Sequence, residues 1–128
     1  MSRSSNAPRY GALVERHARD DRGLEAEHSS WHDARTPSGE PVSIKGAMRR
    51  RADGSTGRFR IFQDAYDTLA KRDGWIYFAA YRPRGRGIEV LRSKMTRART
   101  LRLSDSDFYP SGHHRGPQIK LSIEEVFQ

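Results

Sequence analysis

Three residues around one predicted β-hairpin have side chains that could act together on a phosphate ester. Ser43 and Lys45 lie two residues apart in the apolar segment Pro41 to Lys45, so in a strand they point to the same face. The turn sequence Thr36-Pro-Ser-Gly39 precedes this segment and predicts a reversal of the chain. Folding the hairpin about this turn places Asp33 opposite Ser43 and next to Lys45 on one sheet face.

A second carboxylate is available on the preceding segment. Glu15 lies in a predicted helix, four residues after Gly11, and a glycine there would let the helix approach the sheet or a phosphate closely. Two carboxylates can hold a divalent cation against a phosphodiester, and a neighbouring lysine can orient water or stabilise developing negative charge. Each residue taken alone also fits a plain surface role, such as an ion pair across a solvated hairpin.

The elements that must position these residues follow from hydrophobic periodicity. Helices are expected at 8–19, where Tyr10, Leu13, Val14 and His17 share a face, and at 59–72, where the apolar stripe is Phe59, Phe62, Tyr66 and Leu69. The apolar, aromatic run Trp75 to Tyr81 predicts a buried central strand. Further strands are expected within 24–34 and at 41–45, 88–91 and 118–121, with a terminal turn at 123–127. This order predicts an α/β fold with a mixed central sheet flanked by helices.

Composition limits the classes of function. The chain has 128 residues, no cysteine and a net charge of +8, with a pI of 10.4. Disulfides, thiolate metal sites and cysteine nucleophiles are therefore excluded, and an arginine-rich basic domain points first to nucleic acid. We expect a flexible N-terminal tail at 1–8 and a single domain at 9–128. The polar N-terminus and the lack of an apolar span predict a cytoplasmic protein.

The order Gly11-Ala-Leu-Val-Glu15-Arg16, then Asp33, then Val42-Ser-Ile-Lys45 resembles the PD-(D/E)XK nuclease superfamily, and within it archaeal Holliday junction resolvases. The resemblance covers about residues 9 to 91. It implies a restriction-endonuclease-like αβββαβ core, Glu15 and Asp33 as metal ligands, and Lys45 as a catalytic residue. It further implies Mg²⁺ or Mn²⁺ as cofactor, branched DNA as substrate and a homodimer. Gln63 corresponds loosely to a helix glutamine found in some branches.

Ser43 departs from this pattern, because it stands where the family has an acidic residue. A serine hydroxyl is a weak, neutral metal ligand, and on a helical wheel neither Asp64 nor Asp67 faces the sheet to replace the missing carboxylate. Two alternatives to an active nuclease stay open: a non-catalytic nucleic-acid-binding module on the same fold, and a basic structural or interaction domain.

The remaining arginines, histidines and large aromatic residues support three further predictions. Phosphate contacts are predicted for the arginines of two glycine-containing loops and for one further loop: Arg49, Arg50, Arg51, Arg82, Arg84, Arg86, His114 and Arg115. His28 and His32 have the i, i+4 spacing of a helical metal site, but their segment does not read as a helix, which argues against zinc. The large aromatics Trp31, Trp75 and Tyr77 are expected in the core.

Overall fold

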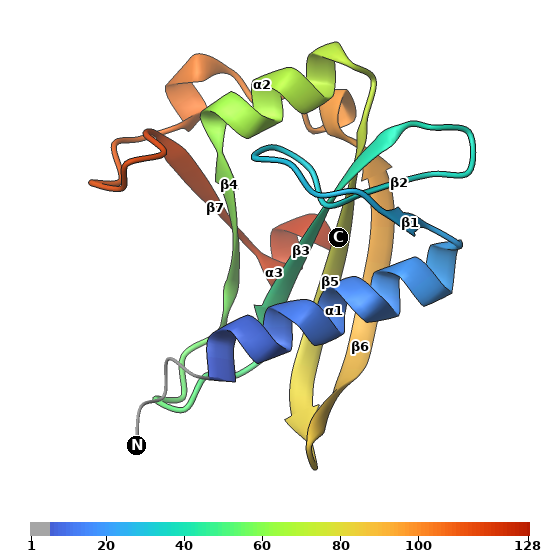
Figure 1. Cartoon of the computed structure of the whole chain (residues 1–128). Helices are drawn as coiled ribbons and strands as arrows, with labels where there is room; N and C mark the ends of the chain where they lie inside the picture. The colour runs from blue at the N-terminus through green and yellow to red at the C-terminus, as the bar shows by residue number, and fades with distance from the viewer. Residues whose placement is uncertain (1–5) are drawn as a thin grey trace.

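The computed structural model describes residues 6–128 and shows a mixed sheet with helices on both faces (Figure 1). The part of the predicted tail at 1–5 lies outside the described residues, and the first helix begins at Asn6, before the expected Pro8. The elements are α1 (Asn6–Arg22), β1 (Glu25–Ala26), β2 (Ala34–Arg35), β3 (Pro41–Met48), β4 (Arg58–Phe62), α2 (Gln63–Lys71), β5 (Trp75–Arg84), β6 (Gly87–Arg97), β7 (Gln118–Ser122) and α3 (Ile123–Val126). Two short 3₁₀ helices, Ala98–Leu101 and Asp105–Asp107, connect β6 to β7.

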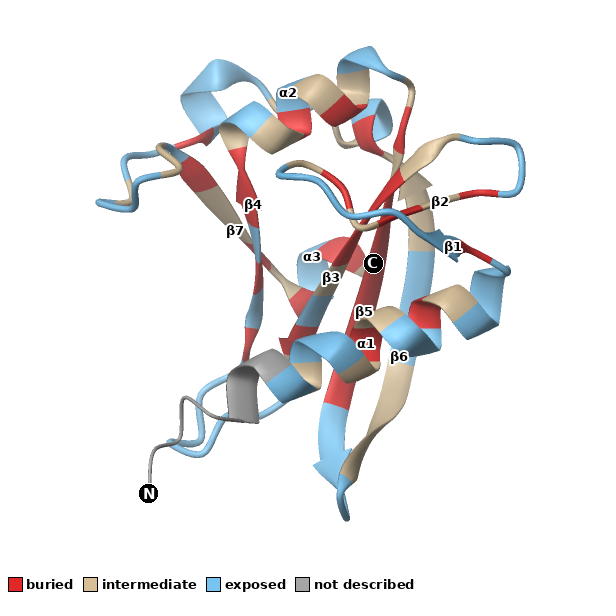
Figure 2. Cartoon of the chain, in the orientation of Figure 1, coloured by how far each residue is buried: buried red, intermediate tan, exposed pale blue. Residues whose placement is uncertain are grey.

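The main sheet has five strands in the order β1-β2-β3-β5-β6. Only the β3–β5 pair is parallel, and the other neighbours are antiparallel. The chain crosses from β3 to β5 through β4 and α2, since parallel neighbours cannot be joined by a tight turn. Burial of β5 on both faces confirms the predicted central strand: Tyr77, Phe78 and Ala79 have no exposed surface (Figure 2).

Two apolar clusters cover the two faces of this sheet. On one face α1 packs Val14 and Ala18 against Val42 and Tyr77. On the other face α2, α3 and the separate two-stranded β4–β7 ribbon enclose Phe78. The predicted mixed α/β architecture is therefore confirmed. None of the helices in residues 6–128 has the length and apolar character needed to cross a membrane.

The predicted helix at 59–72 is wrong over its first four residues. Arg58–Phe62 is instead strand β4, which pairs antiparallel with β7, and α2 begins only at Gln63. The spacing of Phe59, Phe62 and Tyr66 fits a helical stripe, but the same segment alternates from exposed Arg58 to buried Phe59, exposed Arg60 and buried Ile61. The segment forms a strand, with its two-residue alternation of side chains, because it pairs with β7 (Gln118–Ser122).

Close packing of α1 depends on a glycine in the sheet and not on the glycine in the helix. A side chain at Gly11 would meet nothing within 4 Å, so the predicted close approach of the helix to the sheet at this glycine is wrong. A Cβ at Gly46 of β3 would instead lie 3.0 Å from a Val14 methyl group and 3.3 Å from the Tyr81 ring. The missing side chain at Gly46 thus sets the distance between the sheet and the helix that carries Glu15.

Candidate functional site

The predicted hairpin register is confirmed, and it places Asp33 beside the free edge of β3. Ala34 pairs with Val42 and Arg35 with Pro41, which continues to Asp33 opposite Ser43. The Asp33 backbone N–H donates to the Val42 carbonyl at 2.9 Å, and the Asp33 Oδ2 atom accepts from the Ile44 N–H at 2.7 Å. The pairing of β2 with β3 does not extend beyond Ala34 and Val42, so no strand carbonyl is available to the Ile44 N–H. The Asp33 carboxylate accepts this hydrogen bond instead. One carboxylate oxygen is used in this way, and Oδ1 remains available to a ligand.

Glu15, His28 and Asp33 form the one group of potential metal ligands found in residues 6–128. One ligand atom from each lies within 4.8 Å of the others. His28 Nε2 and Glu15 Oε1 are 2.9 Å apart, close to the separation of about 3 Å between adjacent ligands in an octahedron with bonds of about 2.1 Å. Arg19 also approaches Glu15, at 4.0 Å, from one turn further along α1. Two carboxylates and an imidazole in this arrangement fit a divalent cation.

A compact loop between β1 and β2 brings His28 to this position. The Glu27 N–H donates to the Asp33 carbonyl at 3.1 Å, which closes the loop and makes the residues on either side neighbours. Inside the loop, the buried His32 ring bridges Ser29 Oγ, at 2.6 Å from Nδ1, and Glu27 Oε1, at 3.0 Å from Nε2. His32 thus holds the loop together, while His28 is exposed and directed at Glu15.

Lys45 borders two cavities, one of which also contains Asp33. It is half-buried, and it lines both a small cavity of about 140 Å³, together with Asp33 and Ser43, and a larger, basic cavity of about 470 Å³. Burial lowers the pKa of Lys45, the Asp33 carboxylate opposes this change, and Arg115 and Arg60 add to it. The ammonium group is thus partly desolvated, and both carboxylates and other cations act on its pKa.

The structure brings Ser43 into the site but not Gln63. Ser43 is 6% exposed and contributes a hydroxyl to the small cavity where the family pattern would place a carboxylate. Gln63, for which a catalytic role is predicted, lines neither cavity at Lys45, and its side-chain amide donates to Asp105 Oδ1 at 2.8 Å. Gln63 begins the helix, and it is Ala65, two residues later, that borders the cavity.

A basic groove beside Lys45 was missed from the sequence. The cavity of about 470 Å³ runs along the free edge of β3, and we call it the β3–β4 groove; its lining residues are Ile44, Lys45, Gly46, Arg51, Arg58, Arg60, Phe62 and Lys120. Arg60 and Lys120 are direct cross-strand partners in the β4–β7 ribbon. Like charges directly opposite each other are destabilising, so this pairing favours an anionic ligand. The alternation of polar and apolar residues in Arg58-Phe-Arg-Ile-Phe62 indicates a strand with Arg58 and Arg60 on its exposed face, but the spacing of Phe59, Phe62 and Tyr66 favoured a helix there.

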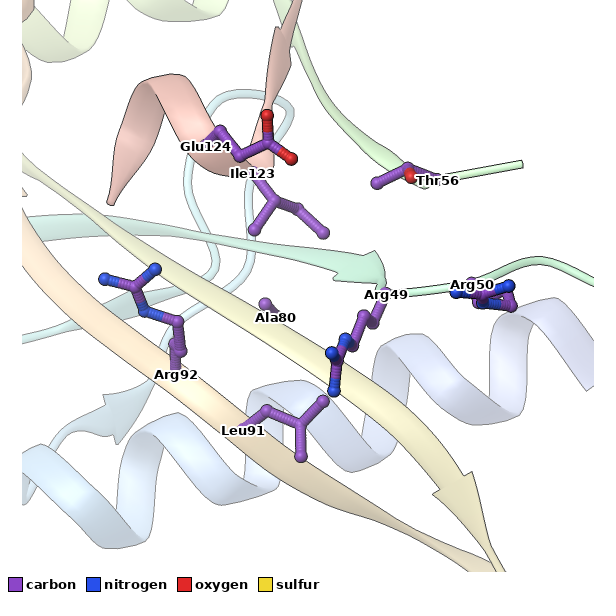
Figure 3. Close-up of a pocket in the computed structure, with 8 residues that line it drawn as sticks. All are labelled: Arg49, Arg50, Thr56, Ala80, Leu91, Arg92, Ile123 and Glu124. Atoms are coloured by element: carbon purple, nitrogen blue, oxygen red, sulfur yellow. The ribbon is translucent and has the colours of Figure 1, made fainter. Parts of the chain in front are cut away.

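The predicted phosphate-binding arginines lie in four different places. Arg51 lines the β3–β4 groove, whereas Arg49 and Arg50 line a different cavity of about 540 Å³. Figure 3 shows the guanidinium groups of Arg49 and Arg92 on either side of Ala80 in that cavity. The Arg92 group is already used, because it donates to the Phe127 carbonyl at 2.8 Å.

The arginines of the β5–β6 hairpin lie far from the site. Phe78 is opposite Lys45, and Arg84 lies six residues further along β5, or about 20 Å at 3.3 Å per residue. Glu89 pairs with Arg82 at 2.7 Å and with Arg84 at 3.8 Å. The hairpin tip, with Arg86, extends beyond α1 at the lower end of the molecule in Figure 1. The structure therefore does not bring this loop to Lys45.

The third predicted loop is only partly at the site. Arg115 lines the small cavity with Asp33 and Lys45, and its guanidinium donates to the Ser30 carbonyl at 2.7 Å and covers the Phe62 ring at 4.8 Å. His114 is exposed and stacks on His113, with ring centroids 4.2 Å apart. Of the two residues, Arg115 is the one that borders the candidate site.

Glu15 on a helix and Asp33 at the edge of β3 lie close enough to hold one cation, and Lys45 shares a cavity with Asp33; these are the kinds of group that metal-assisted phosphodiester hydrolysis uses. The family model described as the PD-(D/E)XK nuclease superfamily domain matches residues 1–128 of this chain. The chain therefore belongs to the PD-(D/E)XK nuclease superfamily, and the restriction-endonuclease-like fold expected from the sequence is confirmed. No curated protein gives a match to the chain.

Proposed function

We propose that this protein is a metal-dependent endonuclease that hydrolyses phosphodiester bonds in DNA. The observation that carries the proposal is the position of Lys45, which borders both the carboxylate-containing cavity and the β3–β4 groove. A phosphate bound in the groove would reach the lysine, and Asp33, one of the three potential cation ligands, lines the small cavity that Lys45 also borders. Membership of a nuclease superfamily supports the same conclusion.

Each residue then has a distinct role. Glu15 and Asp33, together with His28, would hold Mg²⁺ or Mn²⁺, and the bound cation would supply an activated water and offset the charge of the transition state. Lys45 would donate hydrogen bonds to the scissile phosphate or orient the attacking water, and its partial burial would strengthen these interactions. Arg51, Arg58, Arg60 and Lys120 would hold the DNA backbone without reading its sequence.

The substrate and assembly follow from the resemblance stated above. We extend the proposal to branched DNA and a homodimer, because archaeal Holliday junction resolvases combine these properties. Two copies of the groove related by a two-fold axis would contact two strands of a symmetric junction. Light scattering measures the oligomeric state, and a protein that stays monomeric when saturated with a four-way junction would remove this extension without affecting the nuclease proposal.

A cleavage assay tests the activity. Purified protein at about 50 mM salt, with Mg²⁺ or Mn²⁺, should cut linear, nicked or four-way-junction DNA, and chelation by EDTA should stop the reaction. Lys45→Met should slow cleavage by about 10²-fold or more, as expected for removal of one positioned transition-state donor. Lys71→Met is the matched control, since Lys71 is exposed on α2. Absence of cleavage on every substrate, or equal rates for Lys45→Met and the parent, would refute the proposal.

Ser43 favours one alternative, a nucleic-acid-binding module that retained the fold without catalysis. This module would bind DNA through the β3–β4 groove with the same affinity in the presence and absence of divalent cations. If the parent protein does not cut DNA but Ser43→Glu does, with a metal requirement, the alternative is correct and position 43 accounts for the lost activity.

A further inference from the structure

We propose that His28 is the third protein ligand of the metal site and that it supplies the coordination that Ser43 cannot. This inference rests on the proposed function and goes beyond the superfamily pattern, in which the third ligand is an acid on the strand. His28 lies instead in the loop between β1 and β2, before Asp33 in the sequence, whereas Ser43 follows Asp33.

Geometry is the first argument. The Nε2 atom of His28 is 2.9 Å from Glu15 Oε1, and both belong to the cluster whose atoms lie within 4.8 Å of one another. A cation between the three residues would replace the contact between His28 and Glu15 with two metal bonds of ordinary length. The ring therefore needs little displacement to become a ligand.

The rigidity of the loop is the second argument. His28 follows Glu27, whose N–H is bonded to the Asp33 carbonyl, so the backbone fixes the two ligands as neighbours. The Ser29 N–H donates to the His32 carbonyl at 3.0 Å, and the Arg115 guanidinium donates to the Ser30 carbonyl at 2.7 Å. A flexible loop would lose conformational entropy on binding a metal ion, whereas this loop is already ordered by its hydrogen bonds.

The chemistry of the ligand set gives a specific consequence. Two carboxylates and one imidazole have a formal charge of −2, whereas three carboxylates would have −3. Magnesium prefers oxygen ligands and depends strongly on their charge, but imidazole binds transition-metal ions well. The site should therefore prefer Mn²⁺ to Mg²⁺, and the preference should depend on His28.

Metal titration without DNA tests this inference independently of cleavage. We expect calorimetry, and counting of free Mn²⁺ by electron paramagnetic resonance, to show tighter binding of Mn²⁺ than of Mg²⁺ by the parent protein. His28→Ala should weaken Mn²⁺ binding about tenfold or more and reduce the Mn²⁺ preference. His28→Asp should shift the preference towards Mg²⁺. His17→Ala is the matched control, because His17 is exposed on α1 and lies outside the cluster.

The outcomes separate this inference from the proposed function. Unchanged Mn²⁺ affinity and selectivity in His28→Ala, with binding lost in Asp33→Asn, would overturn the role of His28 and leave the nuclease proposal intact. Equal affinities of the parent for the two cations would also overturn the inference. Failure of the parent to bind either cation, together with failure to cut DNA, would overturn both proposals.

Discussion

Asp33 has a structural role and a chemical role, and two substitutions separate them. Its Oδ2 atom accepts a 2.7 Å hydrogen bond from the Ile44 N–H at the point where β2 stops pairing with β3. Asp33→Ala removes this acceptor and leaves a partly buried N–H without a partner. A hydrogen bond to a charged group contributes about 1.5–3 kcal/mol, and a neutral one about 1 kcal/mol. Asp33→Asn keeps an acceptor in nearly the same place but removes the charge that a cation needs.

The two variants should therefore differ in stability but not in metal binding. For a domain of this size, 1 kcal/mol corresponds to roughly 3–5 °C in Tm. We expect Asp33→Ala to melt about 5–10 °C below the parent and Asp33→Asn to lose about half as much. Both variants should lose Mn²⁺ binding and cut DNA at least 10²-fold more slowly.

Thermal denaturation followed by circular dichroism and Mn²⁺ titration make this comparison in the same buffer. If Asp33→Ala melts with the parent protein, Asp33 does not complete the edge of β3. If Asp33→Asn binds Mn²⁺ as tightly as the parent, the carboxylate charge is not part of the site.

Three further predictions follow from the packing and charge around β3. Burial lowers the pKa of Lys45 below its ordinary 10.5, so the folded protein releases this proton at a lower pH than the unfolded chain. The stability of the parent should therefore rise relative to that of Lys45→Met as the pH increases towards 10.5. Urea unfolding at several pH values measures both stabilities, and a difference between them that does not change with pH would contradict the prediction. Gly46→Ala should cost about 1–3 kcal/mol and weaken Mn²⁺ binding, because the new methyl group would meet Val14 at 3.0 Å and displace α1; a Tm and a metal affinity equal to the parent's would show that the helix is not held this closely. Arg60→Ala should reduce the slope of log affinity for duplex DNA against log salt concentration by about 0.9, whereas Arg84→Ala in the β5–β6 hairpin should leave the slope unchanged. Fluorescence anisotropy measures these affinities, and equal slopes for the two variants would argue against the β3–β4 groove as the DNA-binding surface.

The hairpin and its register could be predicted because local signals determine them. The turn at Thr36 to Gly39 fixes where the chain reverses, and the Gly39 N–H donates to the Thr36 carbonyl at 2.8 Å as such a turn requires. The pleat then decides which residues share a face. Asp33, Ser43 and Lys45 could therefore be grouped from their spacing alone. Glu15 could be named only as a further carboxylate on the preceding helix, and the resemblance then implied that it binds metal.

The remaining parts of the site depend on contacts between segments distant in sequence. Strand β4 exists because β7, about sixty residues later, pairs with it, and its local spacing of aromatics fits a helix equally well. His28 reaches Glu15 through a loop closed by backbone bonds and by His32, which gives no periodic signal in the sequence. The arginines of the β5–β6 hairpin look equivalent to the groove arginines in the sequence. The direction of β5 shows that they lie away from Lys45, since Arg84 is about 20 Å along the strand from Phe78, the residue paired with Lys45.

The central claim is that Glu15, His28 and Asp33 bind one divalent cation next to Lys45. The most direct test is the anomalous scattering of a crystal soaked in MnCl₂. We predict a peak about 2.0–2.4 Å from one atom of each of the three side chains. An occupied Mn²⁺ position elsewhere, or no peak at this cluster when the ion saturates the protein in solution, would contradict the claim.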